Sequence, residues 1–261
     1  MSLVFAAVIP HSTATIAANE SSDVASSLVR TRDTIKEVEG ELYVMQPDTL
    51  FVLSPHAPIA DGAFSLNLAQ EFICTYQDFG DDSTSLRLGC DIELISKLRE
   101  YADRDAEKNI PVNIINQPEL DYGSAVALYH LSQHLPAVKI VPISLSNLSI
   151  EQHYRFGQAL RYVAMQSNKR VAFITTAELG HTVVPAGATF AQAVLQAIKS
   201  HDLSELQNFN LELAESAQSV NEFKCFVVLS GVLSDLEVQA KINSNETYNG
   251  RGLLVSQFNL I

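Results

Sequence analysis

Three histidines follow strand-like apolar runs in this chain. His11 comes after a run that starts at Leu3 and stops at Pro10, and His56 comes after a run that starts at Thr49 and stops at Pro55. A third run, 171–176, leads through a short loop to His181. Ligands and metals collect at the carboxyl ends of the strands in open α/β sheets. The sequence therefore predicts a metal site at His11 and His56, with His181 beside it.

A metal that binds both substrate and oxygen also needs a carboxylate. Two neutral imidazoles and one carboxylate on one face of iron(II) leave positions open for both reactants. Glu222 lies in the very apolar segment 220–233, where a charge must be paired. Glu178, just before His181, is the competing carboxylate. Both candidates stay open at this point.

The order of the elements predicts the fold class. The spacing of Leu28, Ile35, Val38 and Leu42 is typical of an amphipathic helix. This helix connects two strand-like runs, which predicts a parallel crossover unit. We expect an α/β fold over residues 1–261 as a single domain, with a mostly parallel or mixed central sheet and helices on both faces. The remaining expected elements are a strand hairpin over 63–77, strands at 112–116, 138–145, 171–176 and from 252, and helices at 90–106, 124–134, 150–167, 188–199, 203–217 and 220–233.

Composition narrows the function classes. A formal net charge of −13 repels phosphate backbones and anionic membranes, which argues against a nucleic-acid or membrane partner. The first apolar run has no basic segment before it, so we expect a strand and not a signal peptide. Cys74, Cys90 and Cys225 form no C-x-x-C pair. Their spacing excludes a zinc ribbon, and it favours buried thiols and a cytoplasmic location.

Five short segments, in order, resemble the class III extradiol ring-cleaving dioxygenases, the LigB-like superfamily that includes protocatechuate 4,5-dioxygenase and the DOPA 4,5-dioxygenases. Ile9-Pro-His11 and Leu53-Ser-Pro-His56 resemble the segments that carry the family's first two metal ligands. Residues 120–129, followed by 140–144, are similar to its Asp-His-Gly block and the next strand. Residues 175–181 resemble the motif of the acid–base histidine, and 221–233 the helix with the carboxylate ligand.

The resemblance implies a non-haem Fe(II) enzyme that opens a catechol-like or aminophenol-like ring with O2. It implies His11, His56 and Glu222 as metal ligands and His181 as the proton carrier, a role that suits an imidazole with a pKa near ~6.5. Zinc, manganese or copper remain alternatives at the same ligands. A homodimer or a second subunit would also fit the family.

Tyr122 departs from the family pattern. The chain has Asp121-Tyr122-Gly123 where the family usually has Asp-His-Gly. A phenol with a pKa near ~10 donates a hydrogen bond but is a poor base at neutral pH. Tyr122 is nevertheless a candidate catalytic residue beside His181. Two alternatives stay open: another metal-dependent enzyme on the same scaffold, and a metal-binding relative similar to the Memo proteins that acts in protein interaction. Tyr122 favours the second of these alternatives.

Overall fold

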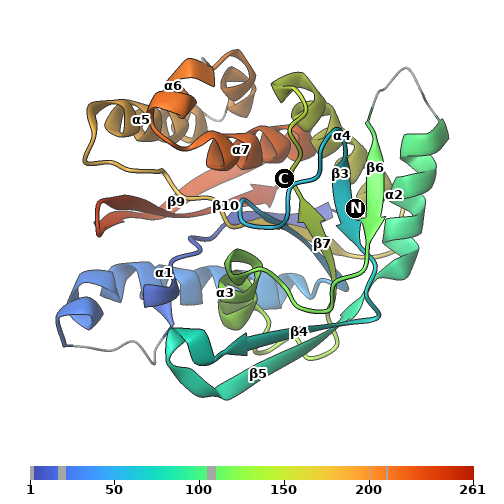
Figure 1. The fold of residues 1–261 in the computed structure, drawn as a ribbon, viewed down its shortest axis with the longest axis horizontal. Helices are drawn as coiled ribbons and strands as arrows, with labels where there is room; N and C mark the ends of the chain where they lie inside the picture. The colour runs from blue at the N-terminus through green and yellow to red at the C-terminus, as the bar shows by residue number, and fades with distance from the viewer. Residues whose placement is uncertain (1–2, 17–21, 105–109, 201, 210) are drawn as a thin grey trace.

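The apolar runs of the sequence form the centre of one mixed sheet with helices on both faces (Figure 1). This is a computed structural model that describes residues 3–16, 22–104, 110–200, 202–209 and 211–261. The expected α/β fold with a mixed central sheet is confirmed. The strands are β1 (Leu3–Val8), β2 (Thr49–Ser54), β3 (Phe64–Asn67), β4 (Glu71–Tyr76), β5 (Asp81–Cys90), β6 (Val112–Ile115), β7 (Lys139–Ser144), β8 (Val171–Thr175), β9 (Val238–Tyr248) and β10 (Arg251–Leu260).

The helices pack against the two faces of this sheet. They are α1 (Ser22–Met45), α2 (Ile92–Arg104), α3 (Tyr122–Leu131), α4 (Ile150–Met165), α5 (Pro185–Lys199), α6 (Leu211–Ser216) and α7 (Val220–Leu233), with short 3-10 helices at Thr13–Thr15, Gln77–Phe79 and Leu203–Asn208. In Figure 1, α1 and α3 lie on one side of the sheet and α4 to α7 on the other. The four helix positions expected to face the core, Leu28, Ile35, Val38 and Leu42, are all buried.

The sheet order is β4-β5-β7-β2-β8-β1-β10-β9, and β3 pairs with β6 and β7. Strands β5, β7, β2, β8 and β1 are parallel neighbours, whereas β10 and β9 add an antiparallel ribbon at one edge. The central strands β2 and β8 are buried along their whole length. This burial explains why residues 50–53 and 171–174 form continuous apolar runs instead of alternating with polar residues.

Three expectations about the strands were wrong or incomplete. The segments around 64–67 and 71–76 do not form a hairpin, because β3 pairs with β6 and β7 while β4 pairs with β5. Strands β5 and β9 were not predicted. Both strands are rich in polar residues, and most of their side chains are partly or fully exposed.

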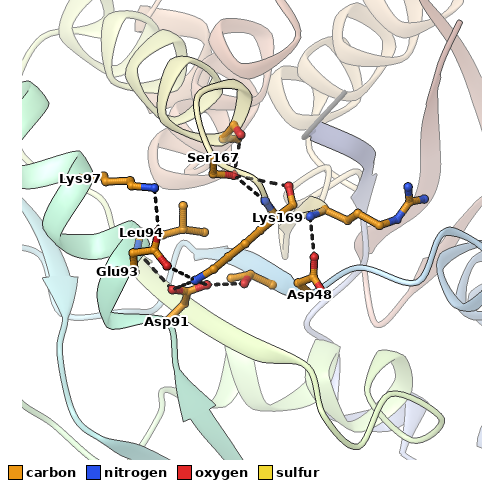
Figure 2. A network of polar contacts seen from close by, with 10 residues as sticks. Asp48, Asp91, Glu93, Leu94, Lys97, Ser167 and Lys169 are labelled. Carbon is orange, nitrogen blue, oxygen red and sulfur yellow. Dashed lines mark hydrogen bonds and ion pairs between the residues drawn. The ribbon is translucent and has the colours of Figure 1, made fainter.

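A polar network ties the amino-terminal edge of the sheet together (Figure 2). The Lys169 Nζ atom lies 2.6 and 2.8 Å from the two carboxylate oxygens of Asp91 and 3.0 Å from Glu93. Asp91 is buried; it also accepts a hydrogen bond from Thr49 Oγ1 at 2.5 Å and caps α2 through the Leu94 N–H. The network therefore joins β2, α2 and the turn before β8.

Helices α4 and α7 cross where two glycines meet. A Cβ atom on Gly157 would come 2.1 Å from the Val228 carbonyl oxygen, and one on Gly231 would come 2.1 Å from the Tyr154 carbonyl oxygen. Only glycine allows backbones this close. The contact fixes the position of α7, which carries Glu222.

Candidate metal centre

Three candidate ligands extend from neighbouring parallel strands at the same height. Val8 in β1 and Leu53 in β2 both lie in register with Thr175 in β8. His11, His56 and Glu178 each follow this row by three residues. Because β8 lies between β1 and β2, the three side chains start from adjacent positions at the carboxyl edge of the sheet.

The two histidines contact each other. His56 Nε2 lies 2.9 Å from His11 Nε2, and the ring centroids are 4.3 Å apart. His11 Nδ1 lies 2.5 Å from the Thr176 carbonyl oxygen, which can only accept a hydrogen bond. The Nδ1 atom therefore carries the proton, and Nε2 of a neutral His11 presents its lone pair to His56. Burial, followed by the nearby His56, lowers the pKa of His11 to about 3, so the ring is neutral at pH 7.

The ring of His56 is positioned by the block that contains Asp121 and Gly123. Ser54 Oγ donates to Asp121 Oδ1 at 2.5 Å, and the His56 N–H donates to Ser54 Oγ at 3.1 Å. Asp121 also caps α3 by accepting from the Ser124 N–H. A Cβ on Gly123 would lie 2.5 Å from Ser54 Oγ and 3.3 Å from the His56 ring. Glycine is thus required for α3 to begin against this strand end.

Tyr122 lies beside the two histidines. Its hydroxyl lies 2.7 Å from His56 Nε2, and its ring centroid is 5.9 Å from that of His11. Burial is the main cause that raises the pKa of Tyr122 to about 12, and the charge of Glu178 adds to it. The phenol is therefore protonated at neutral pH and acts as a hydrogen-bond donor.

Glu178 is a buried carboxylate. Its side chain is 1% exposed, and among the residues that the structure describes neither carboxylate oxygen has a hydrogen-bond partner. Oε2 lies 3.5 Å from His11 Nε2 and 3.8 Å from Arg251 Nη1. Burial raises the pKa of Glu178 to about 7, although Arg251 opposes the shift. A cation between Glu178 and the imidazoles would remove this desolvation cost.

Glu222 lies in the first turn of α7 and is also buried. Burial raises its pKa, and its charge in turn raises the pKa values of Glu178 and Tyr122. The neighbouring Asn221 donates to the Pro55 carbonyl oxygen at 3.4 Å, which ties α7 to the turn before His56. Glu222 is thus within electrostatic reach of the centre, but the contact with His11 belongs to Glu178.

His181 lies three residues beyond Glu178. It is half-buried, and its backbone forms an isolated antiparallel bridge with Arg251. Within the described part of the chain, no contact joins its imidazole to the two central histidines. Arg251, which approaches Glu178, was not identified from the sequence, although the Asn249-Gly250 dipeptide before it is a strong hairpin signal.

The donor set fits a first-row metal. Ligands about 2.1 Å from a metal at a right angle lie about 3.0 Å apart, close to the 2.9 Å between the two Nε2 atoms. A proton on His56 Nε2 can be donated to only one of His11 and Tyr122. A metal ion would instead accept the lone pairs of both imidazoles. Among the described residues, no third histidine, cysteine or carboxylate joins the pair closely enough to make a ready cluster. Glu178 would have to approach further.

Comparisons with known proteins identify the family of this chain. The family model described as the catalytic LigB subunit of aromatic ring-opening dioxygenase matches residues 5–255. Protein CA_C1420 of Clostridium acetobutylicum is 25% identical over 220 residues, which cover 79% of this chain and 47% of that protein. The chain thus spans about half the length of this relative.

The fold is also similar to a solved structure. The crystal structure of uncharacterized protein JW3007 from Escherichia coli K12 superposes with a TM-score of 0.69 and 13% identity. The match covers 97% of this chain and 99% of that one. Separately, none of the helices in the described ranges has both the length and the apolarity needed to span a membrane.

Proposed function

We propose that this chain, which belongs to the LigB family, is a non-haem Fe(II)-dependent dioxygenase that opens a catechol-like or aminophenol-like ring with O2. One observation carries the proposal: His11 and His56 meet at the ends of two parallel strands, and Glu178 follows the strand between them without a hydrogen-bond partner among the described residues. The ring-cleaving activity, the metal and the small aromatic substrate are parts of this proposal. A cytoplasmic location is also proposed, because the three cysteines are free and buried.

His11, His56 and Glu178 would hold the metal. Sequence reasoning placed Glu222 in the third position, but Glu178 is the carboxylate that contacts His11 and lacks a hydrogen bond. Glu222 would then act from α7 by adding negative charge beside the centre. Bound iron(II) supplies the redox chemistry that joins a ring diol to dioxygen.

Tyr122 would donate a hydrogen bond to the substrate, and His181 would transfer a proton. Tyr122 keeps its proton at neutral pH and is 40% exposed, so its hydroxyl can turn from His56 to a substrate oxygen. His181 is proposed as the residue that accepts a proton from the substrate hydroxyl. It lies on the loop after β8 that also carries Glu178, where its backbone forms a bridge with Arg251.

Oxygen consumption tests this function. Anaerobically purified, iron-loaded protein is mixed with a panel of catechols and aminophenols in an oxygen electrode, and ring opening is followed by absorbance. We expect substrate-dependent oxygen uptake by the wild type and its loss in His181→Ala, with iron content unchanged. Oxygen uptake by no member of the panel would contradict the proposed reaction, and unchanged turnover in His181→Ala would contradict the proton role.

Tyr122 favours a second candidate, a metal-binding relative without dioxygenase activity. Its phenol, a poor base, contacts His56 from a position where the resemblance leads us to expect a histidine. This candidate predicts that iron or zinc binds while oxygen uptake stays at the level of free metal. The same electrode assay, run beside metal analysis, separates the two functions.

A further inference from the structure

The loop that follows His11 is joined to helix α3 by one hydrogen bond between side chains. Thr15 belongs to the 3-10 helix Thr13–Thr15 and is 1% exposed. Its hydroxyl donates to the Ser12 carbonyl oxygen at 2.8 Å and lies 2.9 Å from His130 Nε2. Because a hydroxyl has a single proton, which goes to Ser12, its oxygen accepts the hydrogen bond from His130. The Nε2 atom of His130 therefore carries a proton.

His130 is a neutral donor in the last turn of α3. Burial is the main cause that lowers its pKa from 6.5 to about 4, and the charge of Arg32 adds to the shift. The ring is therefore uncharged at pH 7 and has one N–H, which the contact with Thr15 places on Nε2. A buried hydroxyl that loses its partner leaves the free-energy cost of its desolvation uncompensated. His130 thus supplies the side-chain donor that the buried Thr15 hydroxyl requires.

Arg32 of α1 holds the backbone of the same loop. Its Nε atom donates to the Thr15 carbonyl oxygen at 3.2 Å, and its Nη2 atom donates to the Ala14 carbonyl oxygen at 2.9 Å. The loop is therefore held by two helices, by α1 through its backbone and by α3 through its buried hydroxyl.

His11 lies between two points at which the chain is anchored. The sheet holds the chain at Ile9, whose N–H donates to the Thr175 carbonyl oxygen at 3.0 Å. Beyond His11, residues 14 and 15 are held by Arg32 and His130. A shift of the second anchor would move the segment that carries the His11 ring. The contact between Thr15 and His130 therefore bears on where that ring lies.

Helix α3 contacts both histidine segments of the candidate metal centre. At its first residue, the Tyr122 hydroxyl lies 2.7 Å from His56 Nε2. In its last turn, His130 contacts the loop after His11. At a rise of 1.5 Å per residue, the two positions lie about 12 Å apart along the helix. One rigid element therefore touches the segments that follow β1 and β2.

We propose that His130 is a positioning residue that, through Thr15, sets where the His11 imidazole lies relative to His56 and so increases the affinity of the centre for its metal. The inference rests on the proposed function, since it concerns the metal centre of that function. Mutation of groups that orient metal ligands typically weakens metal binding by about 10–100-fold. His130 acts through one further contact, so we expect an effect at the lower end of this range.

Anaerobic titration of the full chain with Fe(II) tests the inference in a double-mutant cycle. We expect His130→Leu and Thr15→Val each to bind Fe(II) about tenfold more weakly than the wild type. The double variant should bind no more weakly than either single variant, because both substitutions remove the same hydrogen bond. His130→Gln, whose amide group can still donate to Thr15, should stay within about threefold of the wild type.

His134→Leu is the matched control. His134 follows α3, is 66% exposed and lies 2.8 Å from Glu39, so this variant should bind Fe(II) as the wild type does. The visible absorption spectrum of protein saturated with Co(II) gives a second readout, because it reports the geometry of the ligands. We expect the spectrum to change in His130→Leu and Thr15→Val and to stay unchanged in His130→Gln and His134→Leu. A purely structural role would lower the melting temperature but would leave the affinity and the spectrum of the folded protein unchanged.

Unchanged Fe(II) affinity in His130→Leu and Thr15→Val would overturn the inference, and so would losses that add in the double variant. Circular dichroism checks the folding of each variant; if His130→Leu does not fold, unchanged affinity in Thr15→Val is by itself sufficient to overturn it. A wild type that binds no metal would overturn the metal centre and this inference together. Oxygen uptake is measured separately. The expected cycle without oxygen uptake would contradict the dioxygenase reaction alone, and uptake with unchanged affinity in both single variants would contradict the role of His130 alone.

Discussion

The Nε2 atoms of His11 and His56 lie 2.9 Å apart, although 45 residues separate the two histidines in the chain. Each lies three residues beyond a strand residue, Val8 or Leu53, that is in register with Thr175 in β8, and β8 lies between the two strands. Two neutral imidazoles that present nitrogen lone pairs to one point repel each other unless a proton or a cation lies between them. This relationship is the basis of the metal-centre proposal.

Tyr122 offers a direct test of the departure from the family pattern. We expect Tyr122→His to raise turnover of catechols at least tenfold, because an imidazole with a pKa near ~6.5 can exchange protons at neutral pH and the phenol cannot. Tyr122→Phe is the control, since it removes the hydroxyl near His56 without adding a base. Steady-state oxygen uptake measures both variants. Equal rates in Tyr122→His and Tyr122→Phe would show that position 122 takes no part in proton transfer.

The network at the amino-terminal edge should contribute strongly to stability (Figure 2). Lys169→Met leaves the buried Asp91 carboxylate without its cation, and breaking a buried pair costs about 3–5 kcal/mol. Because Lys169 remains 24% exposed, we expect a loss of about 2–3 kcal/mol in the free energy of unfolding. Arg87→Met, which breaks an exposed pair with Glu71, should change it by less than about 1 kcal/mol. Urea unfolding measures the free energy of unfolding of both variants. Equal losses in Lys169→Met and Arg87→Met would contradict the stabilising role of the network.

The close crossing of α4 and α7 predicts a sharp response at Gly231. An alanine Cβ there would overlap the Tyr154 carbonyl oxygen, so the helices must separate. We expect Gly231→Ala to lower the free energy of unfolding by about 2 kcal/mol or more, as overpacking does. Gly40→Ala in α1 is the matched control. Its Cβ meets nothing within 4 Å, so it should stabilise the protein by about 0.5–1 kcal/mol. If thermal unfolding shows that both variants are more stable than the wild type, or that both are less stable, this account of the packing is wrong.

His153 should make stability depend on pH. Its side chain is fully buried in α4, and burial lowers its pKa from 6.5 to about 4. The folded state favours the neutral ring, so the contribution is complete above pH 6.5 and is lost as the pH falls through 4. Between pH 7 and 4, the wild type should lose about 2–3 kcal/mol more than His153→Phe. Denaturant unfolding at a series of pH values gives this difference, and parallel curves for the two proteins would rule it out.

Much of the fold could be predicted because its central strands contain continuous apolar runs. The runs before His11 and His56 indicated strands, and the helix between them indicated a parallel crossover. The strands β5 and β9 were missed because exposed antiparallel ribbons lack a continuous apolar run. Each nevertheless pairs with a strand next to it in the chain, β5 with β4 and β9 with β10.

Only part of the candidate site could be predicted from the sequence, because the rest depends on the register of the paired strands. That His11 and His56 each follow a proline at the end of an apolar run was visible in the sequence. The corresponding position of Glu178 became meaningful only once the register of Val8, Leu53 and Thr175 was known. Arg251 reaches the centre through the β9–β10 hairpin, so no local pattern could link it to Glu178.

Anaerobic titration with Fe(II), followed by metal analysis after gel filtration, tests the central claim most directly. The account predicts one Fe(II) per wild-type chain, affinity at least roughly 100-fold weaker in His56→Ala and Glu178→Gln, and a smaller loss in Glu222→Gln. The control variant Arg155→Met, which breaks a surface pair with Glu151 in α4, should bind Fe(II) as the wild type does. Failure of the wild type to bind any first-row metal, or unchanged binding in His56→Ala, would contradict a metal centre built on His11, His56 and Glu178.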